Sequence, residues 1–194
     1  MIASWDIITD TVFQALGCVV ALPGYLQAMK DVCHRHGALI IFDEVMCGMG
    51  RTGYTHAWQH DGVVPDILAV GKGLAAGYGT ISALLLHQGV IEGMREGSAT
   101  FEHGQTYQCH PLDAVAALEV QRIIQEQGLV QNAHKMGELF GALLKKRFQS
   151  HPHVGDVRGK QTNNKQPYSP PLFPSLLFSL SLASRNFIKN QPTN

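Results

Sequence analysis

Two polar side chains that can do chemistry each follow an apolar run. Lys72 stands between two glycines, directly after the apolar residues 67–70, and Asp43 ends the apolar run 38–42. Short apolar runs rich in branched residues predict buried strands. Ligands of parallel α/β sheets bind in the crevice outside the carboxyl ends of the strands, so both side chains are candidates for a functional site.

The pairing of an acid with an amine suggests which ligand this site would take. If the two strands are neighbours, their ends lie roughly 5 Å apart, and Asp43 and Lys72 can reach opposite parts of one flat molecule. Pyridoxal 5'-phosphate has an aldehyde that forms a Schiff base with lysine and a ring nitrogen that needs an anionic partner to stay protonated. The pair is therefore compatible with this cofactor as well as with a simple salt bridge.

Helical and strand-like patterns alternate around these residues, which predicts an α/β fold with a mostly parallel sheet and covering helices. The last expected strand follows its predecessor so closely that it can return antiparallel. The pattern predicts helices at 23–37, 111–128 and 129–148, and strands at 38–45, 67–70 and 80–87.

Composition narrows the class of protein. In 194 residues, 15 basic side chains balance 15 acidic ones, so the charge expected of a nucleic-acid or membrane-surface binder is missing. The most apolar window, 172–183, is too short and too rich in serine to cross a bilayer. Four scattered cysteines without a CxxC favour an intracellular protein. We expect it in the cytoplasm, and a mitochondrial location stays open because the given sequence need not begin at the true N-terminus.

Several motifs in order resemble the class III pyridoxal-phosphate-dependent aminotransferases, the fold type I group that includes omega-amino-acid transaminases. The matching runs are "GYLQAMKDVCHRHGALIIFDEVMCGMGRTG" and "GVVPDILAVGKGL", within a resemblance that covers about residues 15–159. The resemblance implies that the chain is part of the large, cofactor-binding domain of such an enzyme. It also implies transamination, in which an amino group passes from an amino donor to a keto acid.

The resemblance also assigns roles to residues. It implies that Asp43 binds the pyridine nitrogen, that Val45 packs on the ring face and that Lys72 forms the Schiff base. Thr106, in the loop "HGQTYQCHP", would reach the cofactor phosphate of the partner subunit in a dimer. Without the family, Lys72 reads as a solvated turn lysine, Asp43 as a helix-starting carboxylate, Val45 as core packing and Thr106 as a turn hydroxyl.

Two other chemistries fit the residues less well. The run ending in Asp43 and Glu44 has the form of a magnesium-holding strand of ATPases, but the glycine and the Ser or Thr that a phosphate loop needs around Lys72 are missing. Cys33, His34 and His36 are too close in sequence to share one helix face, so a metal site there is disfavoured and no metal is expected.

The sequence departs from the family at several points. Met46 stands where many relatives have a glutamine, and Thr9 and Asp10 stand where they have a Glu-Pro pair. We expect residues 1–150 to be a partial large domain, 151–160 the start of the small domain and 161–194 a disordered tail unrelated to the family. The expected chain is thus truncated at both ends. An inert fragment that at most dimerises with a longer relative is the alternative, and another pyridoxal chemistry ranks third.

Overall fold

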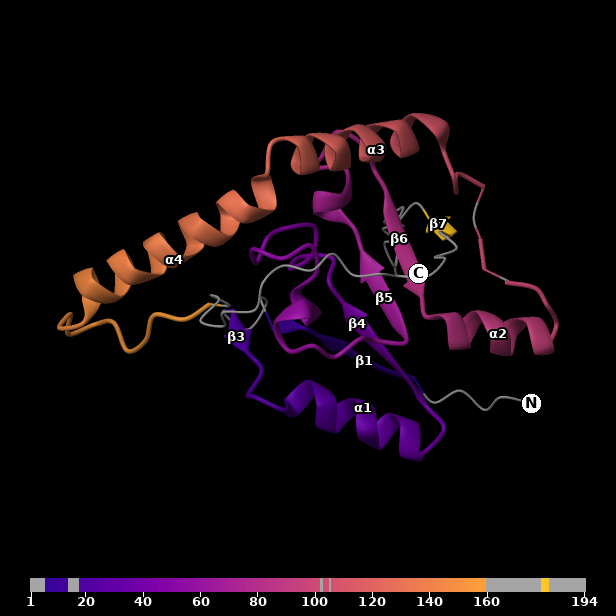
Figure 1. The fold of residues 1–194 in the computed structure, drawn as a ribbon, viewed down its shortest axis with the longest axis horizontal. Helices are drawn as coiled ribbons and strands as arrows, with labels where there is room; N and C mark the ends of the chain where they lie inside the picture. Colours follow the sequence, from indigo (N-terminus) through magenta and orange to yellow (C-terminus); the bar gives the residue numbers. More distant parts are fainter. Residues whose placement is uncertain (1–5, 14–17, 102, 105, 160–178, 182–194) are drawn as a thin grey trace, which may run out of the picture.

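The computed structural model describes residues 6–13, 18–101, 103–104, 106–159 and 179–181. Figure 1 shows an α/β architecture, as predicted, with a central sheet and helices around it. The strands are β1 (Asp6–Asp10), β2 (Val12–Phe13), β3 (Val19–Val20), β4 (Leu39–Asp43), β5 (Ile67–Val70), β6 (Ser82–Leu86) and β7 (Ser179–Ser181). The helices are α1 (Tyr25–Arg35), α2 (Gln88–Glu96), α3 (Pro111–Glu126) and α4 (Leu129–Phe148), with 3-10 turns η2 (Ala57–His60) and η3 (Lys72–Leu74).

The main sheet has the order β1-β4-β5-β6-β7, and β2 pairs with β3 separately. β1, β4 and β5 are parallel, whereas β6 runs antiparallel to β5. β6 can reverse direction because only a short turn separates it from β5. The parallel part therefore brings the carboxyl ends of β1, β4 and β5 to the same edge of the sheet.

One face of the sheet is fully buried. Side chains alternate between the two faces of a strand, and Ile40 and Phe42 of β4, like Leu68 and Val70 of β5, lie in the core. Leu26 and Cys33 of α1 pack in the same core, because apolar residues recur at helical spacing along that helix. Figure 1 shows α1 lying beside β4.

The opposite face is less covered. It carries Ile8 and Asp10 of β1, which pair in register with Ile41 and Asp43 of β4. Ile8 is 68% exposed, while Ile41 and Asp43 are half-buried. Asp43 thus lies on the accessible face of the sheet, and the residue after it in the chain lies on the buried one.

The helix predictions at 23–37, 111–128 and 129–148 are confirmed as α1, α3 and α4, with ends within two residues of those expected. α2 was not predicted. Its sequence contains Gly89 and Gly93, which lower helix propensity. The structure compensates with His87, whose Nδ1 accepts a hydrogen bond from the Gly89 amide (3.2 Å), and with the buried side chain of Ile91.

Residues 161–194, expected to be a disordered tail, lie largely outside the described residues. The structure describes residues 179–181, where β7 pairs antiparallel with residues 82–84 of β6. Within the described ranges, no helix is both long enough and apolar enough to cross a bilayer.

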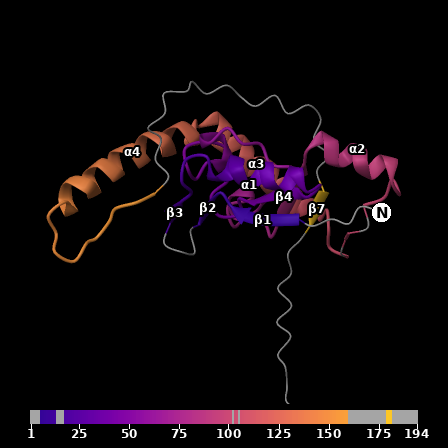
Figure 2. The same ribbon diagram turned by 90° about the horizontal axis from the view of Figure 1, so that it is seen from below.

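The loop after β4 approaches α4 closely at two glycines. A Cβ placed on Gly50 would lie 3.1 Å from Val130 Cγ2, and one on Gly53 would lie 2.8 Å from the Cα of His134. Both glycines have positive φ, +89° and +85°. Beyond this contact α4 extends away from the sheet in both views (Figures 1 and 2), so the two glycines hold the near end of α4 against the loop.

We expect Gly53→Ala to lower the free energy of unfolding more than Gly62→Ala does. Both positions have left-handed backbone, +85° and +68°, which costs an L-residue about 1–2 kcal/mol. A new Cβ meets the α4 backbone only at Gly53, since nothing lies within 4 Å of one at Gly62, and overpacking adds about 1–3 kcal/mol. Urea denaturation of both variants measures the difference. Equal losses would show that the loop can give way without cost.

Candidate functional site

Lys72 occupies a strained turn at the end of β5. It begins η3 with φ of 41°, a left-handed conformation that is uncommon for a residue with a side chain. Gln121 of α3 holds this turn, because its Nε2 donates hydrogen bonds to the carbonyl oxygens of Gly73 (3.3 Å) and Leu74 (2.9 Å). The Lys72 side chain is exposed. The backbone of the turn is therefore fixed while the amine stays accessible, as expected at functional sites that retain strain.

Asp43 and Lys72 are linked by a short series of contacts. Oδ1 of Asp43 accepts a hydrogen bond from the Val45 amide (2.9 Å). The Val45 side chain lies against the next strand, since a Cβ built on Gly71 would be 3.5 Å from Val45 Cγ1. Because Gly71 directly precedes Lys72, the structure brings together the acid, the valine and the lysine that the sequence singled out.

The structure adds Asp10 to this edge of the sheet. Asp10 pairs in register with Asp43, so the two carboxylates lie side by side on one face. Burial and then the nearby Asp43 carboxylate raise the pKa of Asp10. The position of Asp10 beside Asp43 was not predicted, because the parallel partner of β4 cannot be read from one sequence.

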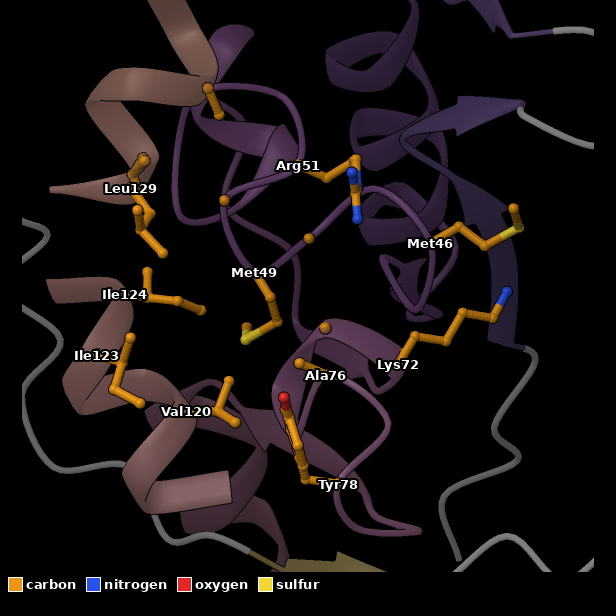
Figure 3. Close-up of a pocket in the computed structure, with 15 residues that line it drawn as sticks. Met46, Met49, Arg51, Lys72, Ala76, Tyr78, Val120, Ile123, Ile124 and Leu129 are labelled. Carbon is orange, nitrogen blue, oxygen red and sulfur yellow. The ribbon is translucent and has the colours of Figure 1, made fainter. Parts of the chain in front are cut away.

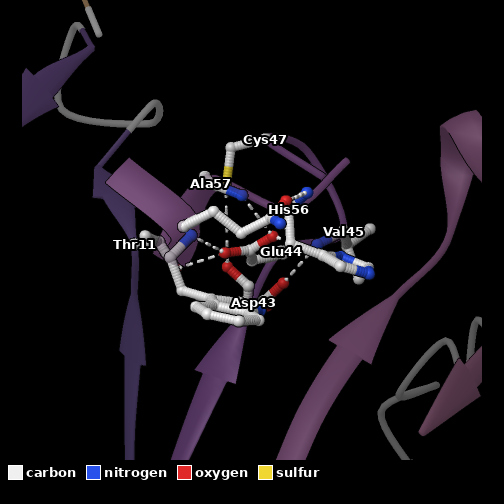
Figure 4. Close-up of polar contacts among 9 residues, drawn as sticks. Thr11, Asp43, Glu44, Val45, Cys47, His56 and Ala57 are labelled. Carbon is white, nitrogen blue, oxygen red and sulfur yellow. Dashed lines mark hydrogen bonds and ion pairs between the residues drawn. The ribbon is translucent and has the colours of Figure 1, made fainter. Parts of the chain in front are cut away.

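Glu44 points to the opposite face and is fully buried. Figure 4 shows the donors that converge on it. Its Oε1 accepts hydrogen bonds from Thr11 Oγ1 (3.0 Å) and the Trp58 amide (2.6 Å), and its Oε2 accepts one from the Ala57 amide (2.7 Å). His56 Nδ1 lies 3.6 Å from Oε2. Glu44 thus ties β4 to the residue after β1 and to η2.

Cys47 lies beside this cluster but is not a candidate nucleophile. The thiol is buried, and burial followed by the Glu44 carboxylate raises the pKa of Cys47 to about 12. A thiol that stays protonated at neutral pH is a poor nucleophile.

A cavity of about 650 Å³ adjoins the Lys72 turn, and Lys72 is one of its lining residues. Its wall on α3 and α4 is apolar and includes Ile123, Ile124 and Leu129. Figure 3 shows the Lys72 side chain directed away from that wall, on the side of Met46. Asp43 and Val45 do not line the cavity. The amine thus borders the cavity at the end away from the two helices, whereas the acid and the valine lie outside its lining.

Thr106 lies apart from these residues. It is exposed, in the irregular segment between α2 and α3, and it does not line the cavity at Lys72. Of the four residues assigned to the cofactor, the structure thus brings three together and leaves the fourth on the surface of the same chain.

Comparison with known proteins identifies the family. The family model for class-III aminotransferases matches residues 3–162, which includes Asp43, Lys72 and Thr106. The chain belongs to the class-III aminotransferase family. The match begins upstream of the region recognised in the sequence and takes in β1. An aminotransferase from Gibberella zeae is 51% identical over 145 residues, which cover 75% of this chain and 28% of the relative.

Solved structures of aminotransferases share this fold. A Bacillus anthracis aminotransferase aligns with a TM-score of 0.75 and 33% identity, covering 80% of this chain and 35% of that one. Ornithine aminotransferase from Toxoplasma gondii, whose crystals show partial occupancy of PLP at the active site, aligns with a TM-score of 0.70 and 31% identity, covering 78% and 35%. The chain thus spans about a third of the length of these aminotransferases.

We expect Asp10→Asn to stabilise the chain at neutral pH. The Asp10 pKa is raised in the folded state, so the folded state binds this proton more tightly than the unfolded state does. The free energy of unfolding therefore falls as pH rises from the pKa of Asp10 in the unfolded state to its pKa in the folded state. Above the folded-state pKa the loss stays constant. Removing one of two adjacent like charges is worth about 0.2–1 kcal/mol.

Thermal unfolding of Asp10→Asn and wild type across this acidic range measures the effect. Asp6→Asn is the matched control, because Asp6 lies on the same strand but pairs with Leu39 instead of an acid. A gain at neutral pH that persists unchanged below both pKa values would contradict the like-charge explanation.

Proposed function

We propose that this chain binds pyridoxal 5'-phosphate and carries the acid and the lysine of an aminotransferase site. The observation that carries the proposal is that Asp43 and Lys72 end neighbouring parallel strands without pairing with each other. No ion pair or hydrogen bond joins Asp43 Oδ2 or Lys72 Nζ to any residue in the described part of the chain. An acid and an amine held close but unpaired are suited to opposite ends of one ligand.

The residues present fit this cofactor. Asp43 uses Oδ1 to accept the Val45 amide, which leaves Oδ2 to accept a hydrogen bond from a protonated ring nitrogen. Val45 lies between the two strand ends, in contact distance of Gly71, where its methyl groups can support one face of a ring. The exposed Lys72 amine can reach an aldehyde.

Each residue would then have a defined task. When bound, the cofactor supplies an electron sink that stabilises negative charge on the carbon next to the substrate nitrogen. Asp43 would keep a proton on the ring nitrogen through Oδ2. Lys72 Nζ would hold the cofactor and, once displaced by the amino donor, would accept the proton from the donor carbon and deliver it again as a general acid. Val45 would keep the ring in register with both residues.

The partners of this reaction are an amino donor and a keto acid. Thr106, exposed and away from Lys72, is suited to contact the cofactor phosphate in a second subunit, either another copy or a longer relative. Large apolar side chains on the outer faces of α3 and α4 support association: Leu112 is 74% exposed, Leu118 72% and Phe140 62%. The same exposure also favours the second candidate function, an inactive chain that pairs with a longer aminotransferase.

Lys72 is expected to be the amine that reacts with the cofactor. The full chain is incubated with pyridoxal 5'-phosphate, reduced with borohydride and digested, and the labelled peptide is identified by mass spectrometry. We expect most of the label on Lys72, and its loss in Lys72→Arg. Label that falls chiefly on Lys145 and Lys146 of α4, with Lys72 unmodified, would refute the proposed function.

A further inference from the structure

Glu44 is a buried charge that the chemistry above does not use. Glu44 stands between the two proposed cofactor residues Asp43 and Val45 in the sequence, and its side chain is fully buried on the opposite face of the sheet. Burying an ionised carboxylate is costly unless it is hydrogen-bonded. A core position next to Phe42 would be filled at lower cost by an apolar side chain, so the position of Glu44 requires an explanation.

Three donors converge on the Glu44 carboxyl group. The Thr11 hydroxyl and the amides of Ala57 and Trp58 converge on its two oxygens at 2.6–3.0 Å. An ionised carboxylate accepts all three, whereas a glutamine would turn an NH₂ group toward at least one N–H or O–H donor. Hydrogen bonds to an ionised group are shorter and stronger than neutral ones.

The hydrogen bonds of Glu44 determine how the neighbouring residue, Asp43, is oriented. Successive side chains of a strand point to opposite faces, and the Glu44 amide extends the ladder by donating to the Ala69 carbonyl (2.9 Å). With Glu44 held on the buried face, Asp43 is held on the accessible one. The Asp43 carboxylate then meets the Val45 amide at 2.9 Å, which orients its second oxygen.

The same hydrogen bonds also determine which residues lie beside Asp43. Thr11 follows Asp10 directly, so its bond to Glu44 holds the end of β1 and keeps Asp10 beside Asp43. The titratable groups that face Glu44 are His56, 3.6 Å from Oε2, and the buried thiol of Cys47. Asp10 faces Asp43 from β1.

We propose that Glu44 is a positioning residue for the cofactor. It sets the orientation of Asp43 and Val45 through the hydrogen bonds that it accepts from Thr11, Ala57 and Trp58. This inference rests on the proposed function, because Asp43 and Val45 are oriented to bind the cofactor proposed at Lys72. It goes beyond that function in assigning the alignment of Asp43 to a residue that contacts neither substrate nor cofactor.

The test compares Glu44→Gln with a matched control at the other end of the sheet. Asp66 is also a buried carboxylate and accepts hydrogen bonds from the Ile40 amide and from His34, both at 2.9 Å. Asp66→Asn should destabilise the fold without reaching the site. Thr11→Val removes one donor to Glu44 and serves if Glu44→Gln does not fold.

Three properties are measured on the full chain: hydrogen exchange at the Ala57 and Trp58 amides, the Kd for pyridoxal 5'-phosphate, and the pH midpoint of the absorbance band formed with Lys72. In Glu44→Gln we expect faster exchange at both amides and cofactor binding about tenfold weaker, as for loss of one charged hydrogen bond. The midpoint should rise by about one pH unit, because a ring nitrogen that loses its proton no longer lowers the pKa of the nearby nitrogen. Thr11→Val should move the midpoint in the same direction, and Asp66→Asn should leave it at the wild-type value.

The outcomes separate the two proposals. If wild type forms no band that depends on Lys72, the proposed function fails and this inference fails with it. If wild type forms the band but Glu44→Gln and Thr11→Val keep its midpoint, Glu44 only stabilises the fold and the inference is overturned. A midpoint that moves equally in Asp66→Asn overturns it too, because general loss of stability would then explain the shift.

Discussion

Parallel pairing of β4 with β5 is the constraint on which the site depends. It brings the carboxyl ends of the two strands to one edge of the sheet, where Asp43 and the turn at Lys72 follow. The pairing is maintained by the buried face of the sheet, where Phe42 and Leu68 are register partners in the core. Slipping the register by one residue would move these apolar side chains to the accessible face, so the core enforces the geometry of the site.

A buried polar cluster complements this apolar constraint. Burial of Phe42 fixes where β4 lies, but it does not fix how the chain leaves the strand. The hydrogen bonds of Glu44 to Thr11, Ala57 and Trp58 do so, since they tie the turn to two other parts of the chain. The strain at Lys72 and its support by Gln121 have the same effect on the neighbouring turn. The turns that follow β4 and β5 are therefore both held by hydrogen bonds, while the Lys72 amine is exposed.

Much of this arrangement follows from local sequence. The apolar run before Asp43 and the glycines around Lys72 predict strand ends, and the pattern after Pro111 predicts α3 with its correct start. What the sequence could not supply depends on tertiary contacts. α2 contains two glycines and is stabilised by a cap and a buried isoleucine. Asp10 reaches Asp43 only through the pairing of β1, and the donors to Glu44 come from residues up to 33 positions away.

The most direct test of the central claim is a crystal structure of the full chain with pyridoxal 5'-phosphate bound and reduced onto its lysine. The geometry predicts that the cofactor is joined to Lys72 and that Asp43 Oδ2 lies within hydrogen-bond distance, roughly 2.7–3.2 Å, of the ring nitrogen, with Val45 against the ring. A cofactor seated instead against the apolar wall of Ile123 and Ile124, or one whose ring nitrogen faces a group other than Asp43, would contradict it.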